Sequence, residues 1–373
     1  MMLAGMTWDH ARAYDCLVAA SERFAAERGT AISWKKRSLQ AFADEPIEQI
    51  ARAYDLVILD HPHVGQISAS GCLLELPDFP DPAATSLGGS VESYIWNSKT
   101  WSYPIDAACQ MAVVRADLGG AFPAHWEDVL EDAGRFSLVT PLLPVDAFDL
   151  MLSMLASRGE ADLPVSPQAF CSEANGLFNL KVLKALFRMG PSEATDWNPI
   201  RVLELLSTSN DFAGSPALFG YINYARPGFR PHQLTYHNLP GFRGHGMPRG
   251  ILGGAGIGVS AFCAHPEEAI AFAQWVTSEP IQSSVYIENE GQPAHLGTWN
   301  RLRHTPRYAG FLDGAYDTIT HAWTRPRDDW FLHFVDDICE IFPAFFLKDR
   351  AEEDMLADIN ALYRKHIGQE AQP

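Results

Sequence analysis

Residues 55–64, with the sequence DLVILDHPHV, decide the fold that the chain predicts. The four consecutive apolar residues 56–59 are typical of a strand that is buried on both faces, as in a parallel sheet. Asp60, His61 and His63 follow at the point where such a strand leaves the sheet. Because ligands of open α/β sheets bind outside the carboxyl ends of the strands, these side chains are the first candidates for a functional site.

The residues before this stretch predict further elements of the same sheet. Residues 2–6 form a short apolar strand, residues 9–28 place apolar side chains on one helical face, and residues 31–35 form a second strand. Asp44, Glu45 and Pro46 are typical of a helix start, and this helix leads into the strand at 56–59. The resulting β-α-β-α-β alternation indicates a parallel sheet.

The order of the strands determines which loops meet. In one common order of doubly wound sheets, 2-1-3, the third strand lies beside the first. The loop at residues 7–10 and the loop at residues 60–63 would then leave the same edge of the sheet side by side. We therefore expect Trp8, Asp9 and His10 to lie near Asp60 and His61.

Length and composition restrict the class of protein. A chain of 373 residues favours two domains, and 47% hydrophobic with 20% charged residues is ordinary globular composition. The formal net charge of -18 argues against nucleic acid, whose binding depends on basic residues that neutralise phosphates. The same charge argues against an anionic membrane surface.

The six cysteines and the first residues bear on the cellular compartment. The cysteines are scattered singly, which predicts reduced thiols without a metal or redox cluster and indicates a reducing compartment. The first twelve residues, MMLAGMTWDHAR, have no basic region followed by an apolar core, and no apolar run is long enough for membrane insertion. The sequence as written predicts a cytoplasmic protein, or a periplasmic one if a leader precedes it.

Several short sequences along the chain are informative because of their order. They are YDLV at 54–57, YPID at 103–106, RADL at 115–118, the proline, tryptophan and acidic residues of 123–129, and the glycine-rich stretch of 256–282 that continues through HPEEA, Phe272 and TSEP. A Gly-Gln-Pro turn follows at 291–293. In this order and spacing they resemble the sugar-type extracellular solute-binding proteins of ABC importers, which have the type II periplasmic-binding-protein fold.

The resemblance implies an α/β protein of two lobes, each a mostly parallel sheet flanked by helices, with a ligand cleft between lobes that close by a hinge. The N-terminal lobe would contain residues 1–106 and 260–310, and the C-terminal lobe residues 107–259 and 311–373. It implies binding of a small polar solute, a carbohydrate or a sugar-derived acid, with an ABC permease as partner and no cofactor, metal or covalent chemistry. We expect a monomer.

Residues from four regions of the chain are predicted to contact the solute. Trp8 would stack on a sugar ring or anchor its loop in the core. Tyr103 and Asp106 lie where the family crosses between lobes. Tyr221 and Asn223 alternate along a strand predicted at 215–224, which directs them to one face. The complete predicted set is Trp8, Asp9, His10, Asp60, His61, Tyr103, Asp106, Tyr221, Asn223, Gly254 at a close backbone approach, Gln292 and His295.

The aspartates and histidines of the first two loops allow three interpretations. Asp9 can be the N-cap of the first helix and Asp60 a turn residue. The set can instead hydrogen-bond a polyhydroxylated or acidic solute. As a third alternative, it forms a metal or acid/base site of a cytoplasmic enzyme, in which Asp60 or His61 is the general base or metal ligand and His10 its partner. A sensor that uses the closing cleft as a switch is a further alternative.

Overall fold

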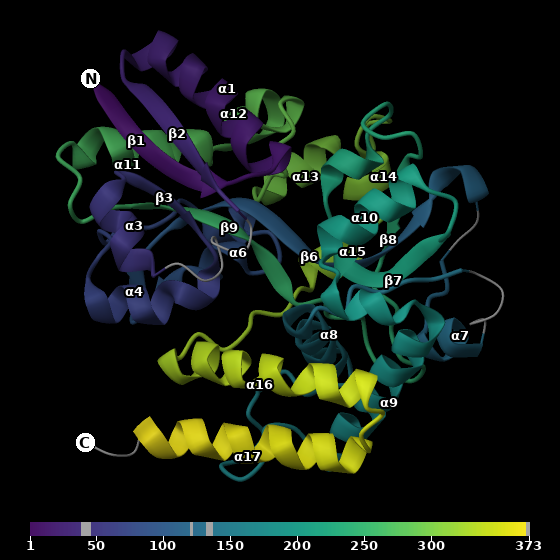
Figure 1. The fold of residues 1–373 in the computed structure, drawn as a ribbon. Helices are drawn as coiled ribbons and strands as arrows, with labels where there is room; N and C mark the ends of the chain where they lie inside the picture. The colour runs from purple at the N-terminus through teal and green to yellow at the C-terminus, as the bar shows by residue number, and fades with distance from the viewer. Residues whose placement is uncertain (39–45, 120–121, 132–136, 371–373) are drawn as a thin grey trace. The chain divides into compact units, whose positions relative to one another are not determined.

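The computed structural model describes residues 1–38, 46–119, 122–131 and 137–370, and Figure 1 shows their helices and strands. The chain forms two compact units. Unit 1 contains Met1–Ala108, Tyr221–Asn223 and Leu252–Thr305, and unit 2 contains Cys109–Gly220, Tyr224–Ile251 and Pro306–Pro373. These units differ from the expected lobes mainly at residues 252–259, which belong to unit 1 because they pair with a strand there.

The sheet of unit 1 has the predicted strand order at its N-terminal end. Its strands run in the order β2 (Ala31–Arg37), β1 (Met2–Trp8), β3 (Leu56–Leu59), β9 (Leu252–Val259) and β6 (Tyr103–Arg115). β1 pairs in parallel with both β2 and β3, which confirms the 2-1-3 order. β9 runs antiparallel to β3, so the sheet is mixed. The last residues of β6 belong to unit 2.

Helices cover both faces of this sheet (Figure 1). The longer helices of unit 1 are α1 (Ala11–Arg28), α3 (Ile47–Ala53), α4 (Val64–Ser70), α11 (Pro266–Val276) and α13 (Leu296–Leu302). Leu56 and Ile58 of β3 belong to the core cluster under α1 and α11, whereas Val57 and Leu59 belong to the cluster under α3 and α4. All four side chains are buried, which confirms the strand buried on both faces.

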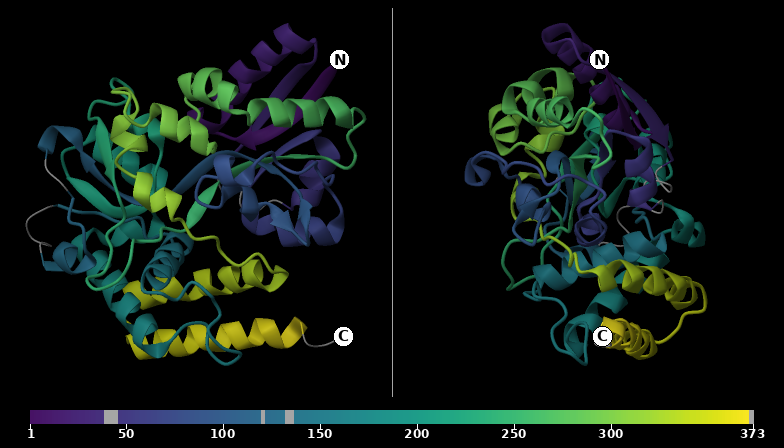
Figure 2. Two further views of the ribbon diagram at one scale, coloured as in Figure 1. Left: turned by 180° about the vertical axis from the view of Figure 1, so that it is seen from behind. Right: turned by 90° about the vertical axis from the view of Figure 1, so that its left-hand side faces the viewer.

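Unit 2 combines two short strands with a helical core. β7 (Gly214–Phe219) and β8 (Leu234–His237) each pair antiparallel with the last residues of β6. The longer helices are α8 (Pro144–Ser157), α9 (Glu173–Met189), α10 (Pro199–Thr208), α16 (Asp329–Leu347) and α17 (Glu352–Glu370). α16 and α17 lie side by side in both views of Figure 2, and aromatic side chains such as Phe148 and Phe334 fill the core beneath them.

Three predicted elements differ from the structure. The strand expected at 215–224 ends at Phe219, and the chain continues into the 3₁₀ turn η4 (Ile222–Ala225). The sequence also predicts a helix at 308–323, and the structure divides it into α14 (Ala309–Leu312) and α15 (Tyr316–Thr320). A short strand is predicted at 138–143 as well, but these residues contain one isolated bridge, and α8 begins at Pro144. The helix start predicted at Asp44 and Glu45 lies outside the described residues.

Candidate functional site

The loop after β1 begins later than expected. β1 continues through Trp8, which pairs in register with Arg37 of β2 and is 5% exposed within the core cluster. Trp8 is therefore not a loop residue, and its position fits the alternative interpretation, an anchor in the core. Asp9 is exposed, and its carboxylate lies 2.7 Å from the ammonium of Lys36.

His10, and not Asp9, caps the first helix. The Nδ1 atom of His10 accepts a hydrogen bond of 3.0 Å from the backbone N–H of Arg12, and His10 has extended backbone angles as an N-cap requires. The interpretation of Asp9 as the N-cap is therefore wrong. An imidazole nitrogen can take this position because it is an acceptor, as the oxygen of a capping aspartate is.

Asp60 and His61 form a local unit at the end of β3. The Oδ1 atom of Asp60 accepts the backbone N–H of His61 at 2.7 Å and lies 3.0 Å from Nδ1 of the same residue. Asp60 thereby caps the short 3₁₀ turn η1 (His61–His63), as the turn interpretation expected. His61 is buried beside the ring of Tyr94. The side chain of Asp60 is 27% exposed.

A buried ion pair that the sequence did not reveal lies between these loops. Arg12, in the first turn of α1, donates from Nε to Oδ2 of Asp106 at 2.7 Å and from Nη2 to Oδ1. Arg12 and Asp106 are 3% and 2% exposed. Burial opposes the charge of Arg12, but the attraction of Asp106 outweighs it and holds the pKa of Arg12 above its ordinary value. The pair is thus a bidentate, charge-assisted contact.

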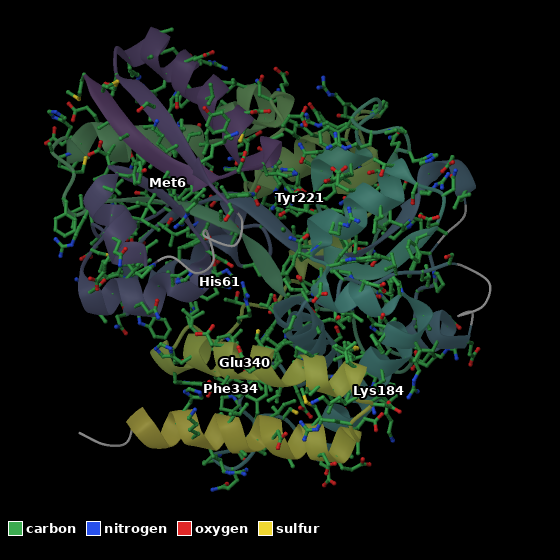
Figure 3. The ribbon with its side chains drawn as sticks, viewed as in Figure 1. Met6, His61, Lys184, Tyr221, Phe334 and Glu340 are labelled. Carbon is green, nitrogen blue, oxygen red and sulfur yellow. The ribbon has the colours of Figure 1, made fainter. Side chains whose placement is uncertain are left out.

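Tyr221 completes this group from a distant part of the chain. Its ring faces the guanidinium of Arg12 at 4.3 Å and meets the ring of His10 edge-on at 4.9 Å. Figure 3 labels the side chains of Tyr221 and His61, which both belong to unit 1. Burial raises the pKa of Asp106, Arg12 opposes this rise, and the charge of Asp60 adds to it.

Because β1 and β3 are parallel neighbours, the loops that follow them leave the same edge of the sheet of unit 1. We define the β1/β3 polar group as His10, Arg12, Asp60, Asp106 and Tyr221. A signal for Arg12 was present in the sequence: it shares the buried face of α1 with Ala13, Cys16, Leu17 and Ala20. An arginine on an apolar helix face requires a buried partner, although spacing alone cannot identify that partner.

The other predicted residues of unit 1 hold the backbone together. Gln292 is fully buried, its Nε2 donates to the carbonyl of Ala107 at 2.7 Å, and its Oε1 accepts the N–H of Ile222 at 3.0 Å. Asn223 lies in a turn instead of a strand and donates to the carboxylate of Glu290 at 2.6 Å. The contact of these two amides with a solute stays a prediction.

Tyr103, Gly254 and His295 also have local roles. The hydroxyl of Tyr103, the first residue of β6, donates to the carbonyl of Pro77 at 2.7 Å. Nδ1 of His295 accepts the N–H of Gly297 and caps α13. Gly254 has φ of +109°, and a β-carbon there would lie 2.2 Å from the carbonyl oxygen of Asp106, so the close approach is one of backbone to backbone.

Three further findings concern metal ions, membranes and cysteines. The described residues include no group of three or more His, Cys, Asp and Glu side chains that could hold a metal ion. None of the helices in the described ranges is both long and apolar enough to cross a membrane. The six cysteines are free, and burial raises the pKa of the Cys16 and Cys109 thiols, so these two behave as small core residues.

The fold is shared with sugar-binding and polyol-binding proteins of known structure, whereas no protein-family model matches the chain. The maltose-bound MalE3 of T. maritima is 16% identical over 98% of this chain and 99% of that one, with a TM-score of 0.82. An ABC transporter solute-binding protein of Agrobacterium radiobacter K84 in complex with ribitol is 16% identical, with 98% of each chain covered and a TM-score of 0.80.

A third neighbour supports the same conclusion. The solute-binding protein of Thermotoga lettingae TMO bound with α-D-tagatose is 15% identical over 98% of this chain and 99% of that one, with a TM-score of 0.80. At such identities the likeness establishes the fold. The chain has the two-lobed α/β fold of ABC transporter solute-binding proteins, as its sequence resemblance predicted.

Proposed function

We propose that the protein binds a small polar solute, a carbohydrate or polyol, as the solute-binding component of an ABC importer. The observation that carries this proposal is the chain-long match in fold to proteins whose structures contain maltose, ribitol and tagatose. Delivery of the solute to an ABC permease, as a monomer outside the cytoplasmic membrane, is part of the same proposal.

The β1/β3 polar group supplies chemistry that suits such a solute. The carboxylate of Asp60 and the imidazole of His10 are partly exposed at the carboxyl ends of the strands. Carboxylate and imidazole groups accept or donate hydrogen bonds to hydroxyls, and the ring of Tyr221 beside them offers an apolar face. This combination is typical of sites that bind polyhydroxylated ligands.

The buried ion pair bears on the charge of the solute. Arg12 is already held by the two oxygens of Asp106, so its charge is matched inside unit 1. A sugar-derived acid would require a cation that is available to its carboxylate. The carboxylate of a sugar-derived acid would therefore need a cation other than Arg12.

A hydrolytic or metal-dependent reaction has less support from the same residues. Asp60 and His61 account for each other through the 3₁₀ turn that they form, and His10 is engaged as a helix cap. These contacts give each of the three side chains a local structural role. The enzyme hypothesis stays a prediction that a metabolite-turnover screen of the Asp60→Asn variant would test.

Thermal unfolding with a solute panel tests the proposed function. A solute at about one hundred times its Kd should stabilise the folded protein by about 2.7 kcal/mol, so its effect on Tm is easily measured. The panel should contain maltose, ribitol, tagatose, other sugars and polyols, and sugar acids. If no member of a broad panel raises Tm, the proposal is contradicted.

Substitutions then locate the site in unit 1. Asp60→Asn should weaken the binding of the active solute by about tenfold, because it removes a charged acceptor of hydrogen bonds. Asp9→Asn is the matched control, since Asp9 is the exposed aspartate of the neighbouring loop and pairs with Lys36. Equal Kd values for the two variants, measured by calorimetry, would place the binding site elsewhere.

A further inference from the structure

One buried side chain holds two distant segments of unit 1 together. Gln292 is fully buried and uses both ends of its amide: Nε2 donates to the carbonyl of Ala107 at 2.7 Å, and Oε1 accepts the N–H of Ile222 at 3.0 Å. Ala107 lies in β6, whereas Ile222 begins the turn η4. Because a buried backbone group without a partner is costly, each hydrogen bond fixes its segment next to Gln292.

Each of the two segments carries one member of the β1/β3 polar group. Asp106 directly precedes Ala107, and Tyr221 directly precedes Ile222. Both contact Arg12: the carboxylate of Asp106 accepts its hydrogen bonds, and the ring of Tyr221 lies 4.3 Å from its guanidinium. A displacement of either segment would therefore move an acceptor or an aromatic face away from the cation.

The turn that contains Gln292 has further contacts with the same segments. Its neighbour Pro293 forms an isolated antiparallel bridge with Asp106 of β6. On the other side of the turn, the carboxylate of Glu290 accepts a hydrogen bond of 2.6 Å from the side chain of Asn223. The turn at 290–293 thus contacts both segments, and Gln292 is the residue whose side chain contacts both at once.

A second buried glutamine in unit 1 provides a comparison. Gln282 is also fully buried, and its Nε2 donates to the carbonyl of Ile105 in β6 at 2.9 Å. Its Oε1 accepts the N–H of Ala294 at 2.8 Å. Within the part of the chain that the structure describes, Gln282 forms no hydrogen bond with the segment of Tyr221. The two glutamines therefore share their chemistry and burial but differ in this one contact.

We propose that Gln292 is a positioning residue of the β1/β3 polar group, which holds Tyr221 in place beside Arg12 and Asp106. It acts through these residues, because backbone groups engage both ends of its amide. This inference rests on the proposed function, in which the β1/β3 polar group contacts the solute. A glutamine that served stability alone would leave the position of Tyr221 unchanged when it is replaced.

Fluorine NMR of the full chain, labelled with 3-fluorotyrosine, tests the position of Tyr221. The resonance of Tyr221 is the one that is absent from the Tyr221→Phe variant. Gln292→Met keeps the length of the side chain but removes both hydrogen bonds, so it should shift or broaden this resonance. Gln282→Met is the matched control, because it makes the same change at the same burial, and it should leave the resonance in place.

Stability measurements separate positioning from a purely structural role. Both methionine variants lose buried hydrogen bonds, so chemical denaturation should show a similar loss of stability in each. Equal shifts of the Tyr221 resonance in the two variants, or no shift in Gln292→Met, would overturn the proposal. If Gln292→Met does not fold, hydrogen exchange of the wild type decides. Slow exchange of the Ile222 amide is then expected, and exchange at the rate of an exposed amide overturns the proposal.

Solute binding connects the position of Tyr221 with the function. The probes are maltose, ribitol and tagatose, which occur in the structures of similar fold. For a probe that binds the wild type, Gln292→Met should weaken binding by about tenfold, and Gln282→Met should weaken it less. Equal affinity of the wild type and Gln292→Met contradicts the inference. If no probe binds, the proposed function loses its support, whereas the fluorine spectra still decide whether Gln292 positions Tyr221.

Discussion

Asp106 in unit 1 and Asp146 in unit 2 are both buried carboxyl groups, yet their surroundings differ. Asp106 receives two hydrogen bonds from the guanidinium of Arg12, which Tyr221 covers. Asp146 has an acidic neighbour, Asp149, and no hydrogen bond in the described part of the chain. Both are nearly inaccessible to solvent, so burial does not separate them.

This difference shows that burial alone does not decide whether a carboxyl group stabilises the fold, because the partners of the group matter as well. A buried charge with a complete set of partners stabilises one arrangement of the chain, and loss of either partner is costly. A buried acid without partners makes the folded state less stable and is retained where it serves another purpose. The same type of substitution should therefore have opposite effects in the two units.

The largest effect is expected from Arg12→Met. This variant leaves Asp106 as a buried carboxylate without compensation, which should lower the free energy of unfolding by about 3–5 kcal/mol. Chemical denaturation monitored by tryptophan fluorescence measures the loss. Arg23→Met is the matched control on the same helix, because Arg23 pairs with Glu27 at the surface, and it should have little effect.

The double variant Arg12→Met/Asp106→Leu separates pairing from packing. It removes both charges and keeps much of the apolar volume, so it should recover most of the stability lost in Arg12→Met. If the double variant is no more stable than the single one, the pair is not the cause of the loss, and the contrast between Asp106 and Asp146 fails.

The sequence predicts the sheet of unit 1 better than its polar contacts. The apolar run at 56–59 and the β-α-β-α-β alternation depend on local pattern, and the strand order 2-1-3 followed from them. The contact between Arg12 and Asp106 joins residues 94 positions apart. No local rule identifies such a partner, although the place of Arg12 on a buried helix face indicates that one exists.

Errors in unit 2 have a related cause. The helix predicted at 308–323 is interrupted near Gly314, where a β-carbon would lie 2.0 Å from the carbonyl of Tyr236 in β8. Close backbone packing of this kind is set by the tertiary structure and not by the 3.6-residue period. The sequence also predicts a helix at 151–156, whereas α8 begins at Pro144, so Asp146 and Asp149 lie outside the predicted helix.

A smaller effect of opposite sign is expected from Asp146→Asn in the absence of any solute. The amide cannot ionise, so the variant should be more stable than the wild type by about 1 kcal/mol at neutral pH. Asp106→Asn, the same change in unit 1, should destabilise the protein, because it leaves Arg12 as a buried charge without its partner. Chemical denaturation of both variants at neutral pH compares them directly.

The pH dependence of Asp146→Asn sharpens this comparison. The folded state raises the pKa of Asp146, so the neutral acid favours folding fully below the ordinary pKa of about 3.9, and this contribution is lost as pH rises through the higher folded value. The stability gained by the variant should therefore be small near pH 4 and larger at pH 7. A variant that is less stable than the wild type at both pH values would show that Asp146 has a structural partner.

The smallest effect concerns the aromatic face on Arg12. The guanidinium lies 4.3 Å from the ring centre of Tyr221, and such a contact contributes about 0.5–1 kcal/mol or more when it is desolvated. Because Tyr221→Leu also changes packing, the contact should be measured as the coupling energy in a double-mutant cycle with Arg12→Met. Tyr221→Phe keeps the face of the ring and so preserves the contact, which means that its own cycle should give a much smaller coupling energy than the Leu cycle. Equal coupling in the Leu and Phe cycles would mean that the ring does not stabilise the cation, and that Asp106 alone distinguishes the buried charges of unit 1 from those of unit 2.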